Sequence, residues 1–107
     1  MQQLSVQQLA EWLADDKRPD PVLLDVREPW ELELCRLAGS QHIPMHLVPM
    51  RCAEIDTDRD IVVICHHGAR SMQVAMFLER QGFDSVLNLS GGVDAWAGEI
   101  DPDMRRY

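Results

Sequence analysis

The run Ile61-Val62-Val63-Ile64 constrains the fold of this chain more than any other feature of the sequence. Consecutive β-branched residues favour a strand, and a run without polar alternation is typical of a strand that is buried on both faces in the middle of a parallel sheet. After a short loop, residues 71–81 are apolar at helical spacing, and Gly82 provides a stop for a helix. The sequence therefore predicts a central strand, a loop and a helix in direct succession.

The same succession of strands and helices extends along the rest of the chain. Ser5 and Gln8 have the spacing of a capping box, which predicts a first helix over residues 6–14. Further strands are predicted over residues 22–26, 41–43 and 85–89, and further helices over residues 30–37, ended by Gly39, and 93–98. Strands that alternate with helices imply right-handed crossovers, so we expect the α/β class, with a mostly parallel central sheet and helices on both faces.

Length and charge set the class of protein. A chain of 107 residues, 46% hydrophobic and 26% charged, fits one domain over residues 1–107 with one core. No apolar run is long enough to span a bilayer, and residues 1–5 do not resemble a signal peptide, so we expect a cytoplasmic protein. The net charge of −8 argues against nucleic-acid and membrane partners. Core or half-buried packing is predicted for the three tryptophans: Trp12, Trp30 and Trp96.

The cysteines point to chemistry rather than to crosslinks. Cys35, Cys52 and Cys65 show neither a disulfide framework nor the paired close spacing of a zinc site, and a reducing compartment is their simplest setting. We expect no cofactor and no resident metal. A metal site formed by Cys65, His66 and His67 is an alternative, but adjacent side chains rarely converge on one ion.

Cys65 stands at the junction between the predicted central strand and the helix that follows it. In open parallel sheets, ligands bind beyond the carboxyl ends of the strands, where the next helix offers unpaired N–H groups and a positive dipole end. Gly68 permits a turn that directs successive amides towards one anionic centre. Helix N-termini and a nearby guanidinium, such as that of Arg70, favour the thiolate form of a cysteine. We therefore predict that Cys65 is a nucleophile.

Three segments of the chain resemble the rhodanese domains. The segment Cys65-His66-His67-Gly68-Ala69-Arg70-Ser71 matches the active-site pattern Cys-x-x-Gly-x-Arg-Ser that many members share. Leu24-Asp25-Val26-Arg27-Glu28 is similar to the family's N-terminal signature, and residues 88–96 are similar to its C-terminal one. The resemblance covers nearly the whole chain and implies the small rhodanese α/β fold.

The resemblance also implies a reaction and its residues. A sulfurtransferase of this kind moves a sulfane sulfur from thiosulfate or a persulfide donor to cyanide or a thiol, and the acceptor in a cell could be a sulfur-carrier protein. Cys65 would take up the sulfur, and Arg70 would hold the small anionic donor. Asp25 and Arg27 are expected to form an internal pair that braces the sheet edge. The amides that would surround the persulfide are those of His66, His67, Gly68, Ala69, Arg70 and Ser71.

The chain departs from the family pattern between the first two signatures. Cys35 and Arg36 stand where members often have glycine and histidine. The change leaves the loop intact but alters the wall of the pocket. Cys35 could resolve a persulfide; alternatively it packs beside an exposed Arg36, as most surface charges are only solvated.

Two other functions share parts of this pattern. Cell-cycle phosphatases resemble rhodanese domains in fold, but they place one residue more between cysteine and arginine, and the shorter ring here suits a single sulfur atom. A regulatory or protein-binding module is the other alternative, although such modules often lack the cysteine. His66 and His67 could protonate a leaving group, or they could be solvent-facing residues that add positive potential.

Overall fold

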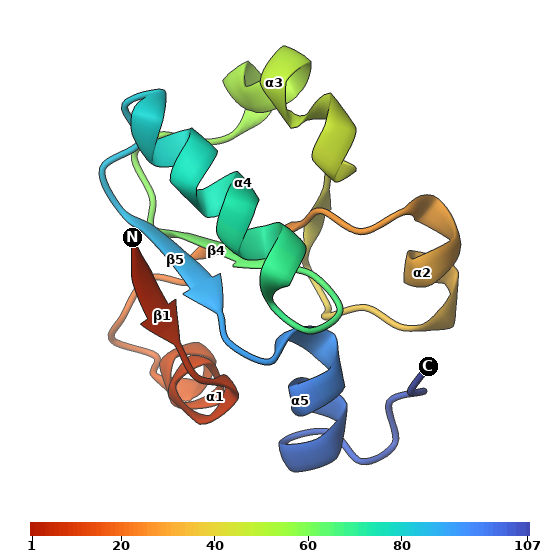
Figure 1. Ribbon diagram of the computed structural model, residues 1–107. Helices are drawn as coiled ribbons and strands as arrows, with labels where there is room; N and C mark the ends of the chain where they lie inside the picture. The colour runs from red at the N-terminus through yellow and green to blue at the C-terminus, as the bar shows by residue number, and fades with distance from the viewer.

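A computed structural model describes residues 1–107 as one five-stranded parallel sheet with helices packed on it (Figure 1). The strands are β1 (Gln2–Leu4), β2 (Val22–Asp25), β3 (Gln41–His42), β4 (Ile61–Ile64) and β5 (Val86–Leu89), in the order β1-β5-β4-β2-β3. The helices are α1 (Val6–Ala14), α2 (Pro29–Leu34), α3 (Val48–Arg51), α4 (Ala69–Arg80) and α5 (Gly92–Glu99). None of these helices has both the length and the apolar character needed to cross a bilayer.

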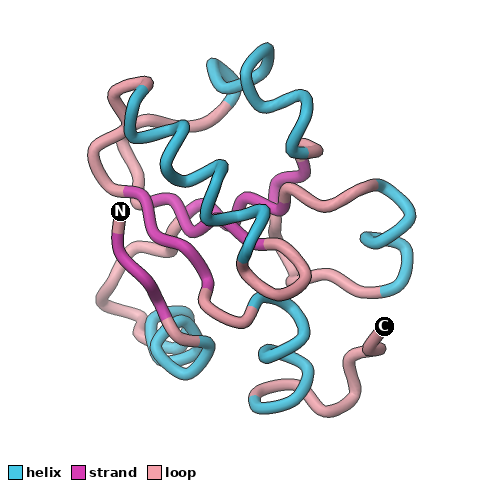
Figure 2. Tube along the Cα trace, viewed as in Figure 1, coloured by secondary structure: helices cyan, strands magenta, loops and turns pink.

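The helices form two layers around the sheet (Figure 2). Ile61 and Val63 point from β4 into a core shared with α3 and α4, whereas Val62 and Ile64 point into a core shared with α1 and α5. Because side chains alternate along a strand, this uninterrupted apolar run supplies both cores at once. The predicted α/β class, with a parallel sheet covered on both faces, is confirmed.

The structure corrects the sequence prediction at several points. The strand β1 was not predicted; it pairs with the outer side of β5, and Leu4 lies beside Leu89. The second helix ends at Leu34 rather than near Gly39, because Cys35 adopts an extended backbone with φ of −167°. Trp30 is 59% exposed, so its predicted packing role is wrong, whereas Trp12 is buried as expected.

Parallel strands bring three connecting segments to one edge of the sheet. In the register of the sheet Asp25 pairs with Ile64 on the neighbouring strand, so the residues that follow β2 and β4 lie next to each other. The loop after β5 lies at the same edge, since β5 is the other neighbour of β4. This carboxyl edge carries the candidate site.

Candidate functional site

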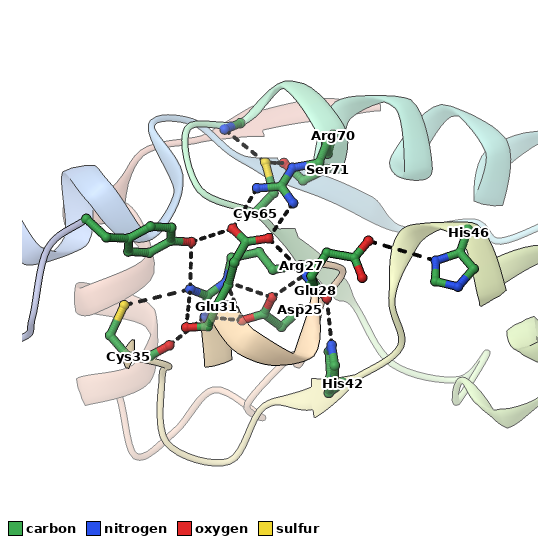
Figure 3. Close-up of polar contacts among 12 residues, drawn as sticks. Asp25, Arg27, Glu28, Glu31, Cys35, His42, His46, Cys65, Arg70 and Ser71 are labelled. Carbon is green, nitrogen blue, oxygen red and sulfur yellow. Dashed lines mark hydrogen bonds and ion pairs between the residues drawn. The ribbon is translucent and has the colours of Figure 1, made fainter. Parts of the chain in front are cut away.

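The side chain of Cys65 lies at the start of α4, directly after β4 (Figure 3). The backbone N–H of Gly68 donates to the Cys65 Sγ over 3.1 Å, and the hydroxyl of Ser71 lies 3.2 Å from the same sulfur. Gly68 has a φ of +110°, a left-handed conformation that suits glycine, and this turn directs its N–H at the sulfur. Cys65 is 1% exposed, so its sulfur lies inside the loop rather than on the surface.

Asn88, a buried residue of β5, fixes the orientation of this loop. Its Nδ2 donates to the carbonyl of Gly68 over 3.1 Å and to Gln3 over 3.0 Å. Because a carbonyl can only accept, the amide nitrogen of Asn88 must face Gly68 and its oxygen must face Ser71. The single hydroxyl proton of Ser71 then goes to Asn88, which leaves the hydroxyl oxygen to accept the proton of the Cys65 thiol.

The start of α5 holds the loop from the other side. The N–H of Val93 donates to the carbonyl of Cys65 over 3.0 Å. The N–H of Asp94 donates to the carbonyl of His66 over 3.1 Å. A Cβ at Gly92 would lie 2.4 Å from both of these carbonyl oxygens. Close approach of the two backbones therefore requires glycine at position 92.

Arg70 is engaged by an acid from α2. Its Nη1 and Nη2 donate to the two carboxylate oxygens of Glu31 over 2.7 and 2.9 Å, and the carboxylate is almost fully buried. The hydroxyl of Tyr107 donates to Glu31 over 2.6 Å, and the N–H of Glu28 donates over 3.0 Å. The hydrogen bonds from Arg70 are the main cause that lowers the pKa of Glu31 to about 2, against the opposing effect of burial. The same pair raises the pKa of Arg70.

Asp25 and Arg27 form a buried ion pair beneath this bridge, with Arg27 Nη2 lying 2.7 Å from Asp25 Oδ2. Arg27 also donates to the carbonyl of Cys35 over 2.7 Å and to the hydroxyl of Tyr107 over 3.0 Å. Burial lowers the pKa of Arg27, but its hydrogen bond with Asp25 and its other contacts outweigh burial and raise it overall. Burial raises the pKa of Tyr107 to about 12. One polar network thus runs from β2 through Tyr107 and Glu31 to the cysteine loop (Figure 3).

The two histidines of the loop differ in their surroundings. The ring of His66 lies between those of Tyr107 and His67, at 3.8 Å from each, and nearly parallel to the tyrosine. Burial, followed by the charge of His67, lowers the pKa of His66, so the ring is neutral near pH 7. His67 is mostly exposed and lies 3.9 Å from Asp94.

His66, His67 and Asp94 are the group whose ligand atoms lie close enough to hold a metal, within 4.8 Å of one another. Cys65 does not belong to this group. The two imidazole planes differ by only 31°, and the lone pairs of a histidine lie in the plane of its ring. Stacked rings of this kind do not direct their nitrogens at one ion, so the group is a poor fit to a metal.

Cys35 lies in a different environment from Cys65. It packs at the margin of the core under α1 and α5, and its Sγ lies 3.7 Å from Nη1 of Arg27. Arg36 is exposed. The three cysteines, Cys52 included, are free thiols. This arrangement fits the packed Cys35 beside a solvated Arg36 that the sequence offered as one alternative.

The sequence did not identify three of the residues that complete the site: Glu31, Asn88 and Tyr107. Glu28 and Glu31 have the spacing of a capping box at the start of α2, and the structure forms that box. That spacing could have placed Glu31 but not its bond to Arg70, which is 39 residues away. No local signal marks Tyr107, which reaches the site from 76 residues beyond Glu31.

Known proteins match both the sequence and the fold. The family model of the rhodanese-like domain matches residues 5–99. A sulfurtransferase of Allochromatium vinosum is 42% identical over 95 residues, which are 89% of this chain and 87% of that protein. The thiosulfate sulfurtransferase GlpE of Stutzerimonas stutzeri is 36% identical over 83 residues, which are 78% of this chain and 76% of that protein.

The structural likeness is equally broad. The crystal structure of a rhodanese-related protein from Thermoplasma volcanium superimposes with a TM-score of 0.84 and 29% identity, covering 94% of each chain. Other curated relatives are much longer proteins, of which this chain spans 26% to 34%. The chain therefore matches both free-standing relatives and one part of larger ones.

Proposed function

Because this chain belongs to the rhodanese-like domain family, we propose that it is a sulfurtransferase that carries a sulfane sulfur on Cys65. The observation that carries the proposal is the position of the Cys65 sulfur, which receives the N–H of Gly68 at the start of α4. The start of a helix stabilises negative charge, and a thiolate is the nucleophile in sulfur exchange. The N–H of Gly68 can therefore support negative charge on the Cys65 sulfur during the reaction.

The reaction proceeds in two steps. In the first, the Cys65 thiolate attacks the outer sulfur of the donor; a new S–S bond forms as the donor's S–S bond breaks, and the electron pair leaves on sulfite or on a thiolate. In the second, an acceptor nucleophile attacks the outer sulfur of the Cys65 persulfide and takes it. The electron pair of the broken bond returns to Cys65, which is again a thiolate.

The loop residues assist through their backbone. In this proposal the amides of residues 66–71 surround the persulfide, and Gly68 already donates to the sulfur. The carbonyls of Cys65 and His66 point to α5, where the N–H groups of Val93 and Asp94 bind them. Negative carbonyl dipoles are thereby kept away from an anionic persulfide. The acceptor is a thiol or a sulfur-carrier protein in this proposal.

The test is sulfur transfer to cyanide, measured as thiocyanate, with thiosulfate and with glutathione persulfide as donors. The parent protein should form thiocyanate, and Cys65→Ser should abolish this activity. Cys52→Ser is the matched control, since Cys52 is also a free thiol but lies outside the loop, and it should retain the activity. Thiocyanate formation at the parent rate in Cys65→Ser would overturn the proposal.

The same preparations separate this function from the phosphatase alternative. Only His66, His67, Gly68 and Ala69 stand between Cys65 and Arg70. We expect no useful hydrolysis of aryl phosphates by this short ring. Cys65-dependent phosphate release without any persulfide would favour the phosphatase.

A further inference from the structure

The guanidinium of Arg70 is the positive group of the cysteine loop, yet its charge is already balanced. Glu31 accepts from both of its terminal nitrogens, over 2.7 and 2.9 Å. The Glu31 carboxylate is held in turn by Tyr107 and by the N–H of Glu28, so it is anchored from three sides. A paired, fork-to-fork arginine is a weak attractor for a second anion, because that anion must compete with a fixed carboxylate.

The other charged groups around the loop are also paired. Arg27 is matched by Asp25 in a buried ion pair. Arg106 lies 3.1 Å from Asp94, which also faces His67. His66 is neutral near pH 7, as its burial implies. Each of the arginines Arg27, Arg70 and Arg106 therefore has an acidic partner, and the chain as a whole carries a net charge of −8, which repels anions.

We infer that Glu31 determines the donor of this site: by neutralising Arg70 it selects a persulfide, R–S–SH, over thiosulfate. The inference rests on the proposed function and specifies its substrate. Thiosulfate must bring a sulfonate group next to the reacting sulfur and release it as sulfite, a dianion. In a persulfide the inner sulfur, which becomes the leaving group, is bonded to carbon and carries no charged oxygen atoms. The rest of the donor remains outside the loop.

The step with a persulfide balances without any further reagent. The Cys65 thiolate attacks the outer sulfur of R–S–SH, which forms Cys65–S–SH and breaks the donor's S–S bond. The electron pair leaves on R–S⁻, and this thiolate takes up the proton that Cys65 lost when it ionised. The leaving group carries one negative charge on its sulfur rather than the two of sulfite, so Arg70 can remain paired with Glu31 during the step.

Glu31→Gln tests the inference because it removes the negative charge and keeps the size of the side chain. The readout is the rate at which the intact protein gains one sulfur, followed by mass spectrometry, with thiosulfate and with glutathione persulfide as separate donors. The ratio of the two rates, thiosulfate to persulfide, should rise about tenfold or more in Glu31→Gln, since Arg70 then offers a free charge. Partial loss of folding would lower both rates and leave the ratio unchanged.

Glu54→Gln is the matched control. Glu54 makes the same kind of two-point bridge, accepting from Nε and Nη2 of Arg51 over 2.9 and 3.0 Å, but at an exposed position outside the cysteine loop. Its ratio of rates should equal that of the parent protein. An unchanged ratio in Glu31→Gln would overturn the inference while leaving the proposed function intact. A parent protein that gains no sulfur from either donor would instead overturn the proposed function.

A second measurement needs no variant. In the parent protein, thiosulfate uptake should become faster as salt is added, because the dianion meets a net negative protein without an open cation, and salt screens that repulsion. If Arg70 were unpaired and attracted the donor, added salt would screen that attraction and slow thiosulfate uptake. A rate of thiosulfate uptake that falls with ionic strength would therefore contradict the role of Glu31.

Discussion

Two junctions at the same edge of the sheet are built alike and used differently. The β4–α4 and β5–α5 junctions each pass from a buried strand through a left-handed glycine, Gly68 or Gly91, into a helix. At the first junction the N–H of Gly68 faces a side chain, the sulfur of Cys65. At the second, the helix amides face backbone, the carbonyls of the first junction. One helix start thus faces the cysteine sulfur, while the other holds that loop in place.

The difference explains why the family signature extends beyond the cysteine loop. Residues 88–96 include no nucleophile, yet they supply Asn88, which orients Ser71, and Gly92, which allows the close approach of α5. Their role is to fix the loop geometry. Damage to the supporting junction should therefore impair the reactive one.

Gly92→Ala should break this arrangement most strongly. The new Cβ would lie 2.4 Å from the carbonyls of Cys65 and His66, at a φ of +58° that L-residues seldom adopt. We expect a loss of at least about 3 kcal/mol in the free energy of unfolding and the loss of most sulfur transfer. Gly82→Ala is the control: its φ is also positive, but nothing lies within 4 Å, and it should cost only about 1 kcal/mol. Equal costs in denaturant unfolding would refute the supporting role.

Lowering the pH should reduce the free energy of unfolding, because it weakens the ion pair between Glu31 and Arg70 at the β4–α4 junction. Hydrogen bonds from Arg70 lower the pKa of Glu31 from 4.5 to about 2 on folding. A lowered pKa contributes stability that is fully present above pH 5 and is lost as the pH falls through 2. About 2 kcal/mol of this contribution should disappear between pH 7 and pH 3.

The measurement is denaturant unfolding at both pH values. Glu31→Gln should lose less stability than the parent between pH 7 and pH 3, because it has no carboxylate to protonate. Glu54→Gln, the exposed counterpart, should retain nearly the parent's dependence. An identical dependence in Glu31→Gln would show that Glu31 does not anchor the loop.

Asn88→Ala removes the side chain that links the two junctions. It removes one of the two contacts of the Gly68 carbonyl, which keeps the N–H of Met72, and it leaves the hydroxyl of Ser71 with the Cys65 sulfur as its remaining partner. The expected cost is about 1–2 kcal/mol, together with slower uptake of sulfur by Cys65. Gln3→Ala removes only the outer contact of Asn88 and should cost less than about 0.5 kcal/mol. A sulfur uptake rate in Asn88→Ala equal to that of Gln3→Ala would contradict the linking role.

Local patterns were sufficient to predict most of the fold. The apolar run of β4 and the periodicity of α4 depend on neighbouring residues, and both elements lie close to their predicted positions. The strand β1 escaped prediction because three residues carry no periodic signal, and only pairing with β5 defines it. The second helix stops early because the extended Cys35 gives its carbonyl to the buried Arg27.

The residues of the candidate site also fall into those that a local pattern predicts and those that only the tertiary structure brings together. Cys65 and the loop that follows could be proposed from one short segment at the end of a strand. The bond between Arg70 and Glu31 could not, because it joins helices far apart in the sequence, and the arginine itself suggested only a free binding group. Tyr107 reaches the network through tertiary packing alone.

The most direct test of Cys65 as the sulfur carrier is to locate the transferred sulfur. The parent protein is exposed to glutathione persulfide, and its persulfides are alkylated, digested and mapped by peptide mass spectrometry. One added sulfur is expected on the peptide that contains Cys65, and none on those with Cys35 or Cys52. A sulfur found on Cys35 or Cys52, with Cys65 unmodified, would contradict that role of Cys65.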